Sequence, residues 1–437
     1  MKLSLFVACA LAVMTASLDA QPARPGADFR TQYIRLGSND AEGLLYQPAQ
    51  APKLGIALVY AHPSGNNFNH ASGREMARRG YPVLTVNYRG ESDSLGYLPV
   101  ISRGIAHVQS LPDVRRVILV GHSGGGHLNA LYQNVAEHGP SACQGGGKIY
   151  PCRGEGLAGL EKPDGLILLD PTLGAFHQMS SVDPAVQTGK RIAGLDMFSP
   201  GNGYDRQEKR ATYSAQFARR FYAAQSARNA RIVEGALARL QALSQGKGRF
   251  SDDEPLVISG RGVGPAGARL YQPDTKYAAS TKAPHLLLRA GGGDAEQIIA
   301  SVRPPSGGQA AAALDSLSVM TQNTTVRRFL AESAIRTSAN FAITGNDIIG
   351  VDWSSAVTST PANAAGVSVP ALVLTMSCHY LVVPGEIVFD HLGSRDKTYA
   401  AVEGAAHVFT PCRPEYGDTV KRTFDFVDAW LAKPGRF

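Results

Sequence analysis

The chain has 437 residues, of which 44% are hydrophobic and 18% charged, so it can bury a sizeable core and is not globally disordered. This length suits one large domain with an insertion, or two domains. The formal net charge is +7, but the sequence has no dense basic run, which argues against nucleic-acid binding.

The N-terminal residues predict a secretory signal peptide over residues 1–20. The start is positively charged, the apolar run from Leu3 to Met14 is too short to cross a bilayer with ease, and Ala20 suits the last position before cleavage. A lipoprotein signal that uses Cys9 is the alternative. No other segment is long and apolar enough to be an anchor. We therefore expect an exported protein, periplasmic or secreted, without a stable membrane anchor.

Short apolar runs alternate with helical patterns in the first part of the chain. Near-continuous apolar strands separated by helices predict a parallel sheet with helices on both faces. An antiparallel pair at 31–37 and 42–48 leads into this pattern. The expected strands are 54–63, 82–90, 115–121 and 164–171, and the expected helices are 68–81, 98–111 and 128–138.

The pattern breaks over residues 172–368, which hold helices and connectors rich in Gly, Pro and Ser. Strand signals return at 369–377 and 398–404, and a helix over 418–433 closes the chain. The simplest account is one α/β domain that a large insertion interrupts between its fourth parallel strand and its last two.

We therefore expect residues 21–171 and 369–437 to form the α/β core and residues 172–368 to form a mainly helical cap. Segment 206–249 of this cap carries ten Lys and Arg against two Glu. The simpler interpretation is a solvated helical face. The alternative is a surface that attracts acidic substrates.

Four cysteines remain once the signal peptide is removed: Cys143, Cys152, Cys378 and Cys412. An even count in an exported chain predicts two disulfides. Cys143 and Cys152 flank a glycine-rich loop, so a short bridge between them is the simple pairing. Cys378–Cys412 is then the long-range bridge. Free, buried thiols are the alternative.

A serine lies between a strand and a helix in the segment Gly-His-Ser-Gly-Gly, residues 121–125. A serine in a sharp strand-to-helix turn projects its hydroxyl above the sheet edge, and Gly121 and Gly125 remove side chains that would collide there. The Gly124 N–H, at the start of the following helix, can face a developing oxyanion. The context predicts that Ser123 is a nucleophile rather than only the small residue of a glycine-rich turn.

This strand–turn–helix unit, with its flanking strands, resembles the α/β-hydrolase fold over residues 50–171 and 369–437. The segment "NYRGESDS" at 87–94 is similar to the one these proteins carry after the strand that precedes the nucleophile strand. The resemblance implies a serine hydrolase with the chain order serine, acid, histidine. It also implies a cap inserted after the fourth parallel strand, where residues 172–368 lie.

The expected general base is His407. It follows the last strand and precedes the last helix, and of the eleven histidines it alone does so. Histidine suits this role because its pKa lies near operating pH. His391 falls in an expected helix. A Cys378–Cys412 bridge would tie the penultimate-strand loop to the loop just after His407.

The acid departs from the family's pattern. Family members usually place an Asp after the penultimate strand, but here His379 or Tyr380 occupies that position. Asp170, one strand earlier, is the preferred candidate, because some members, including pancreatic-type lipases, take their acid from this place. Glu386, at the start of the following helix, is the alternative, and an acid elsewhere or none at all is the third possibility.

The oxyanion loop also departs from the pattern. Family members often carry His-Gly after the first parallel strand, but here Pro63 follows His62 and has no N–H to give. Ser64 is therefore the better donor candidate, partnered with Gly124. An ordinary Pro-Ser-Gly turn is the alternative. We expect His62 to be structural.

Together these features predict an exported hydrolase of small or polymeric carboxylic esters. Ser123 attacks, His407 moves the proton and Asp170 orients His407. An amidase or peptidase with the same residues, and an inactive binding protein of this fold, are the alternatives. No metal or organic cofactor is implied, because no His/Cys cluster has metal-ligand spacing and the glycine run 124–126 lacks the lysine of a phosphate loop.

Overall fold

The computed structural model describes residues 28–437 except 38–40, 90–92, 188–189, 263–266 and 308–320. The expected signal peptide therefore lies outside the described residues. Among the helices of the described part, none combines the length and the apolarity that crossing a bilayer requires.

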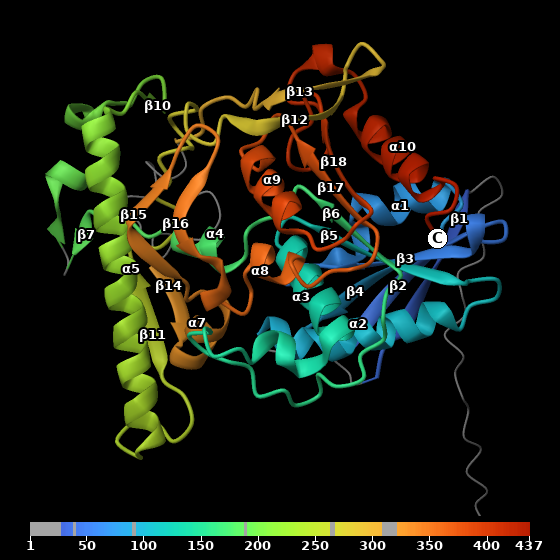
Figure 1. Cartoon of the computed structure of the whole chain (residues 1–437), viewed down its shortest axis with the longest axis horizontal. Coiled ribbons are helices and arrows are strands. Elements are labelled where there is room, and N and C mark those ends of the chain that lie inside the picture. Colours follow the sequence, from blue (N-terminus) through green and yellow to red (C-terminus); the bar gives the residue numbers. More distant parts are fainter. Residues whose placement is uncertain (1–27, 38–40, 90–92, 188–189, 263–266, 308–320) are drawn as a thin grey trace, which may run out of the picture.

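A mostly parallel sheet forms the core of the molecule (Figure 1). Its central strands are buried along their whole length, because helices cover both faces. Only the pairs β1–β2, β2–β4 and β12–β13 are antiparallel. This is the predicted α/β-hydrolase fold class. The strand order is β1 (Phe29–Arg35), β2 (Ala41–Pro48), β4 (Val83–Tyr88), β3 (Ile56–Ala61), β5 (Arg116–His122), β6 (Gly165–Leu169), β17 (Ala371–Met376), β18 (Lys397–Val402), β12 (Ser280–Leu288) and β13 (Asp294–Ala300).

Helices cover the two sides of this sheet. On one side lie α2 (Ser94–Gln109), α3 (Gly125–His138) and α9 (Val382–His391), whose buried residues share one cluster with the strands. On the other side lie α1 (Ala71–Arg78) and α10 (Thr419–Leu431). In α10 the buried residues Phe424, Val427 and Leu431 recur at helical spacing, which sets the face that packs on the sheet.

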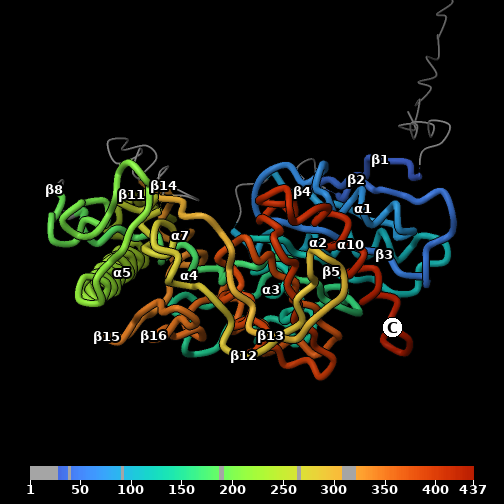
Figure 2. Tube along the Cα trace, turned by 90° about the horizontal axis from the view of Figure 1, so that it is seen from above, coloured from blue at the N-terminus to red at the C-terminus, as the bar shows by residue number. Residues whose placement is uncertain are grey.

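Much of the described part of 172–368 forms a second lobe beside the core (Figures 1 and 2). The lobe is mixed rather than mainly helical. The long helix α5 (Ala215–Ser244) lies beside two strand pairs, β11 (Pro255–Ser259) with β14 (Thr321–Thr325), and β15 (Arg336–Ile343) with β16 (Ile348–Asp352). Arg219, Arg220 and Arg231 of α5 are exposed, as expected of a solvated helical face.

The insertion also adds strands to the core sheet. β12 pairs in parallel with β18, and β13 pairs with β12 as the outer strand (Figure 1). The sequence did not predict this, because such pairing joins segments that lie more than a hundred residues apart. The core sheet is therefore continuous with the inserted lobe at this edge.

Candidate active site

The register of three neighbouring strands brings Ser123 and Asp170 together. β5 and β6 pair in parallel with His122 opposite Leu169, so Ser123 and Asp170 are each the first residue beyond the paired strand ends. The Asp170 N–H continues the ladder by donating to the Leu374 carbonyl of β17 at 2.8 Å. In open α/β sheets such carboxyl ends are where sites form.

Ser123 occupies the tight turn that the sequence predicts. Its φ is 55°, a left-handed conformation that is uncommon for residues other than glycine. A Cβ on Gly121 would lie 2.3 Å from the Gly125 carbonyl oxygen, and a Cβ on Gly125 would lie 2.5 Å from that of Ala61. Both positions therefore require glycine.

A line of hydrogen bonds joins Ser123, His407 and Asp170. Nε2 of His407 lies 2.8 Å from Oγ of Ser123, and Nδ1 of His407 lies 2.6 Å from Oδ2 of Asp170. The Asp170 side chain is fully buried, whereas that of His407 is 29% exposed. The structure thus brings together the three residues that the sequence nominates. In this order they can move a proton from a hydroxyl to an imidazole.

The charge of Asp170 is set by its partners. Burial by itself raises the pKa of Asp170, but the imidazoles of His379 and His407 and their hydrogen bonds outweigh it, so the pKa lies well below its usual value. Asp170 Oδ1 also accepts the Met376 N–H at 3.1 Å. The carboxylate is therefore ionised at neutral pH.

His379 belongs to the site, although the sequence did not nominate it. Its Nδ1 lies 2.7 Å from the same Asp170 oxygen that His407 uses, and the two imidazole rings lie 4.4 Å apart. The only sequence signal was its position, which is the one where related proteins usually carry the acid.

Glu386, the alternative acid, makes its hydrogen bonds to β12, and within the described part of the chain none of them reaches His407. Its carboxylate accepts the N–H groups of Lys282 and Ala283 and lies 2.9 Å from Nε2 of His285. These groups belong to β12, next to the register shift of that strand at 280–284. Glu386 therefore satisfies backbone donors of an irregular strand that the insertion contributes.

In the oxyanion loop, the ring of His62 contacts Ser64, the residue expected to donate its N–H to the oxyanion. Nδ1 of His62 lies 2.7 Å from the Ser64 carbonyl oxygen and 3.2 Å from the Ser64 nitrogen, so the ring lies against its own loop. The same ring lies over the turn, since a Cβ on Gly124 would come within 3.2 Å of His62 Nε2. His62 is thus a wall of the site. The Gly124 N–H makes no hydrogen bond with the described part of the chain.

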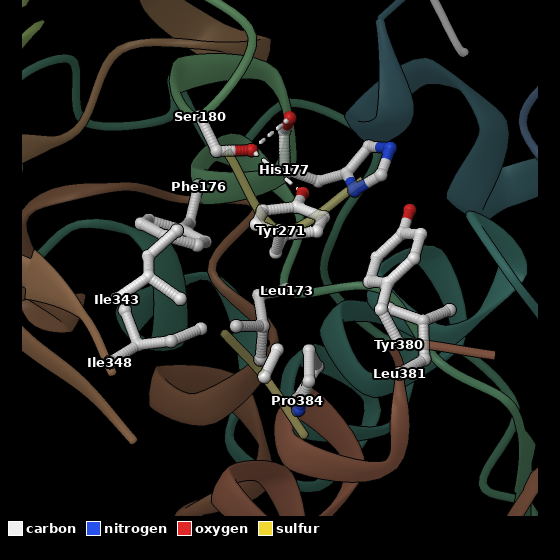
Figure 3. A pocket seen from close by; sticks show the side chains of 11 residues that line it. Leu173, Phe176, His177, Ser180, Tyr271, Ile343, Ile348, Tyr380, Leu381 and Pro384 are labelled. Atoms are coloured by element: carbon white, nitrogen blue, oxygen red, sulfur yellow. Dashed lines mark hydrogen bonds between the residues drawn. The ribbon is translucent and has the colours of Figure 1, made fainter. Parts of the chain in front are cut away.

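A small apolar cavity lies between the core and the insertion, close to the site (Figure 3). It begins at Leu173, three residues after Asp170, and at Tyr380, next to His379. Its volume is about 10 Å³, room for roughly one water molecule. Ser180 and Tyr271 supply hydroxyls at 3.4 Å from each other. The other lining residues are Phe176, His177, Ala278, Ile343, Ile348, Leu381 and Pro384.

A polar opening of about 80 Å³ lies beside the oxyanion loop, at Pro63. Glu332 of the insertion reaches it, and its carboxylate accepts the Ser94 N–H at 2.5 Å and the Ser94 hydroxyl at 2.8 Å. Burial raises the pKa of Glu332. The exposed Arg328 lines the same opening. The two spaces beside the site thus differ in polarity.

Asp170, His379 and His407 also have the donor types of a metal site, with ligand atoms within 4.8 Å of one another. The separations of 2.6 and 2.7 Å are those of charge-assisted hydrogen bonds. A zinc ion bonds each ligand at about 2.0–2.2 Å, so it would have to push these atoms apart and displace both protons. The spacing therefore fits proton-mediated contacts.

Both predicted disulfides are present in the structure. Cys143–Cys152 closes the glycine-rich loop after α3, with a sequence separation of 9. Cys378–Cys412 has a separation of 34 and joins the loop after β17 to the loop after β18. The second bridge therefore links the segments that carry His379 and His407.

Comparison of the sequence with protein-family models and with curated proteins finds no match. Among solved structures, the chain is similar to a brefeldin A esterase described as a bacterial homologue of human hormone-sensitive lipase, with 15% identity, coverage of 95% of this chain and 79% of that chain, and a TM-score of 0.39. A thermophilic carboxylesterase from a metagenomic library shares 12% identity over 93% and 90% of the two chains, with a TM-score of 0.39. A hypothetical protein of Pseudomonas aeruginosa shares 12% identity over 95% of this chain and 98% of that chain, with a TM-score of 0.40. Likeness at this level carries no information about activity.

Proposed function

We propose that the chain is a serine hydrolase that cleaves carboxylic esters through an acyl-enzyme. The observation that carries the proposal is the contact of His407 with a serine oxygen at 2.8 Å and a carboxylate oxygen at 2.6 Å. The serine stands in a left-handed turn, a sparsely populated conformation typical of active sites. The carboxylate is buried and ionised, as an orienting group requires.

The proposed reaction has two steps. Ser123 Oγ attacks the ester carbonyl carbon while its proton passes to Nε2 of His407, and that proton then leaves with the alcohol. Water next attacks the acyl-enzyme, gives one proton to His407 and releases the acid, after which Ser123 regains its proton. Asp170 holds the Nδ1–H tautomer of His407 and stabilises the imidazolium. The Gly124 N–H holds the oxyanion, and the Ser64 N–H joins it once it has left Nδ1 of His62, to which it donates at 3.2 Å in the structure.

The two spaces beside the site suggest how an ester would lie. We place the acyl group in the apolar cavity that begins at Leu173 and Tyr380, and the alcohol in the polar opening at Pro63. Because the cavity has room for roughly one water molecule, a group of about that size, such as the methyl of an acetyl ester, suits it best. We further propose that the protein works after export, since two disulfides persist in oxidising compartments.

A fluorophosphonate probe tests the proposal directly. We expect covalent labelling of the oxidised protein, its loss in Ser123→Ala, and normal labelling of Ser110→Ala, which alters an exposed serine. Rates with a nitrophenyl ester and an aminoacyl-nitroanilide separate esterase from amidase. A folded wild type that neither labels nor turns over either substrate would favour the binding-protein alternative.

A further inference from the structure

Asp170 is held by more donors than a catalytic carboxylate needs for one histidine. Its Oδ2 lies 2.7 Å from Nδ1 of His379 and 2.6 Å from Nδ1 of His407, and its Oδ1 accepts the Met376 N–H. His379 thus contacts the carboxylate as closely as the proposed base does.

The protons on these two imidazoles follow from the charge of the carboxylate. An ionised carboxylate can only accept hydrogen bonds, so Nδ1 of both His379 and His407 carries a proton. Burial lowers the pKa of His379 despite the nearby Asp170, so this imidazole is neutral at pH 7. His379 therefore donates through Nδ1 and adds no charge.

We propose that His379 is a positioning residue: its Nδ1–H fixes the Asp170 carboxylate in the orientation that His407 requires. The inference rests on the proposed function. The acid follows β6 in this chain, and the position after β17 carries the group that anchors it. Such an anchor matters because a carboxylate that rotates presents Oδ2 to His407 only part of the time.

His379 is itself held in place. The Ser301 hydroxyl donates to its carbonyl oxygen at 2.8 Å, and its neighbour Cys378 is bridged to Cys412. Its ring lies 4.2 Å from that of Tyr380. A donor with a fixed main chain and a packed ring loses little entropy when it binds the carboxylate, so it is preorganised.

The neutrality of His379 is necessary for its positioning role. A cation at this position would compete with the imidazolium of His407 for the charge of Asp170 and weaken its stabilisation in the transition state. The charged and titratable groups that influence His379 are Asp170, His407 and Arg303, with Tyr380 and His177 on the cavity side. Arg303 binds backbone carbonyl groups of the insertion, not the carboxylate.

The test compares two amide variants of nearly equal polarity. Asn places its N–H₂ group near the position of Nδ1, whereas Gln places it about one bond farther out. We expect His379→Asn to keep kcat for a nitrophenyl ester within about threefold, and His379→Gln to lose roughly 10- to 100-fold in kcat with little change in KM. In the Gln variant the unanchored carboxylate stabilises the imidazolium of His407 less well, so the acid limb of the kcat/KM profile moves to lower pH.

His285→Asn is the matched control, because His285 is the partner of another buried carboxylate, Glu386, away from the site. It is expected to leave kcat and the pH profile unchanged. Equal kcat in the Asn and Gln variants overturns the proposal, whether both are active or both impaired. If His379→Gln does not fold, His379→Ser replaces it with the same expected loss. Failure of the proposed function is separate, because it appears as activity that survives Ser123→Ala.

Discussion

Nε2 of His122 lies 2.8 Å from the backbone carbonyl oxygen of His407 and donates its proton to it. The tautomers behind this contact are determined by the neighbours. The Ser72 N–H lies 3.2 Å from Nδ1 of His70 and so makes it an acceptor. Nε2 of His70 then carries the proton that it donates to Nδ1 of His122 at 3.3 Å. Two neutral histidines thus connect helix α1 to the main chain of the proposed base.

This chain of hydrogen bonds predicts that His122 supports turnover by holding the main chain of His407, without touching substrate. His122→Leu removes the donor and is expected to lower kcat about tenfold or more, because small displacements of a reacting group are costly. His122→Gln carries an N–H₂ group near the position of Nε2 and should recover most of the loss. Steady-state rates with a nitrophenyl ester decide the matter. His391→Gln, an exposed helical histidine, is the control, and equal rates for Leu and Gln at position 122 would refute the role.

Because several histidines are buried in their neutral form, we expect the fold to lose stability as pH falls, before the carboxylates take up protons. Burial lowers the pKa of His70 and of His127 to about 3, and that of His122 well below its usual value. The unfolded chain binds more protons than the folded one below pH 6.5. Each histidine therefore lowers the free energy of unfolding by up to about 1.4 kcal/mol per pH unit as pH falls from 6.5 toward 3.

The measurement is Tm of the oxidised protein between pH 7.5 and 4.5. We expect a steady fall below pH 6.5 that is shallower in His127→Gln than in the wild type. His127 suits this test because its buried Nδ1 has no hydrogen-bond partner within the described residues. A wild-type Tm that stays constant over this range would contradict the prediction.

Amide substitution should affect turnover at one candidate acid and stability at the other. In Asp170→Asn one of the two acceptor oxygens becomes an N–H₂ group. That group faces either the two imidazole N–H groups or the Met376 N–H, all of which are donors, so kcat should fall roughly 10³- to 10⁴-fold. Glu386→Gln should leave kcat within about twofold. It should lower Tm, because hydrogen bonds to a charged acceptor contribute about 1.5–3 kcal/mol each. Initial rates and thermal melts of both variants test this, and near-normal turnover in Asp170→Asn would refute the assignment.

The candidate site could be predicted from the sequence where a residue's place follows from chain order. Ser123 lies in a local pattern that predicts its turn, and Asp170 and His407 each follow a recognisable buried strand. The carboxyl ends of neighbouring parallel strands meet at one edge, so the three residues come together. The sequence could not decide between Asp170 and Glu386 as the acid. The register of β6 places Asp170 beside His407, and the irregular start of β12 engages Glu386, and neither feature can be read from the sequence.

The sequence could not predict the histidines that support the site. The contacts of His379 and His122 depend on loop conformations and ring orientations, for which the chain carries no periodic signal. The pairing of β12 with β18 was missed for a related reason, since pairing between distant strands leaves no local pattern. Local propensity predicted the core strands because their burial is continuous, and it failed in the insertion, where short strands alternate with turns.

The disulfides predict different effects on activity. Replacing both Cys378 and Cys412 with Ser frees the loops of His379 and His407, so kcat should fall about tenfold and Tm should also fall. Chain-entropy estimates are roughly 4 kcal/mol for this bridge and roughly 3 kcal/mol for Cys143–Cys152. The Cys143/Cys152 double variant should therefore lose stability but keep kcat. Equal kcat in the two double variants would show that the longer bridge serves stability alone.

The apolar cavity predicts a preference for short acyl chains. With room for roughly one water molecule, the cavity fits the methyl of an acetyl group but not a long chain, so kcat/KM for nitrophenyl esters should fall at least tenfold from acetate to octanoate. Ile348→Ala removes part of a wall that the insertion contributes, and it should raise the octanoate rate relative to acetate several-fold. Ile349→Ala, on the exposed side of the same strand, should leave the ratio unchanged. If Ile348→Ala and Ile349→Ala give the wild-type ratio alike, the acyl group lies elsewhere and the polar opening at Pro63 becomes the site to vary.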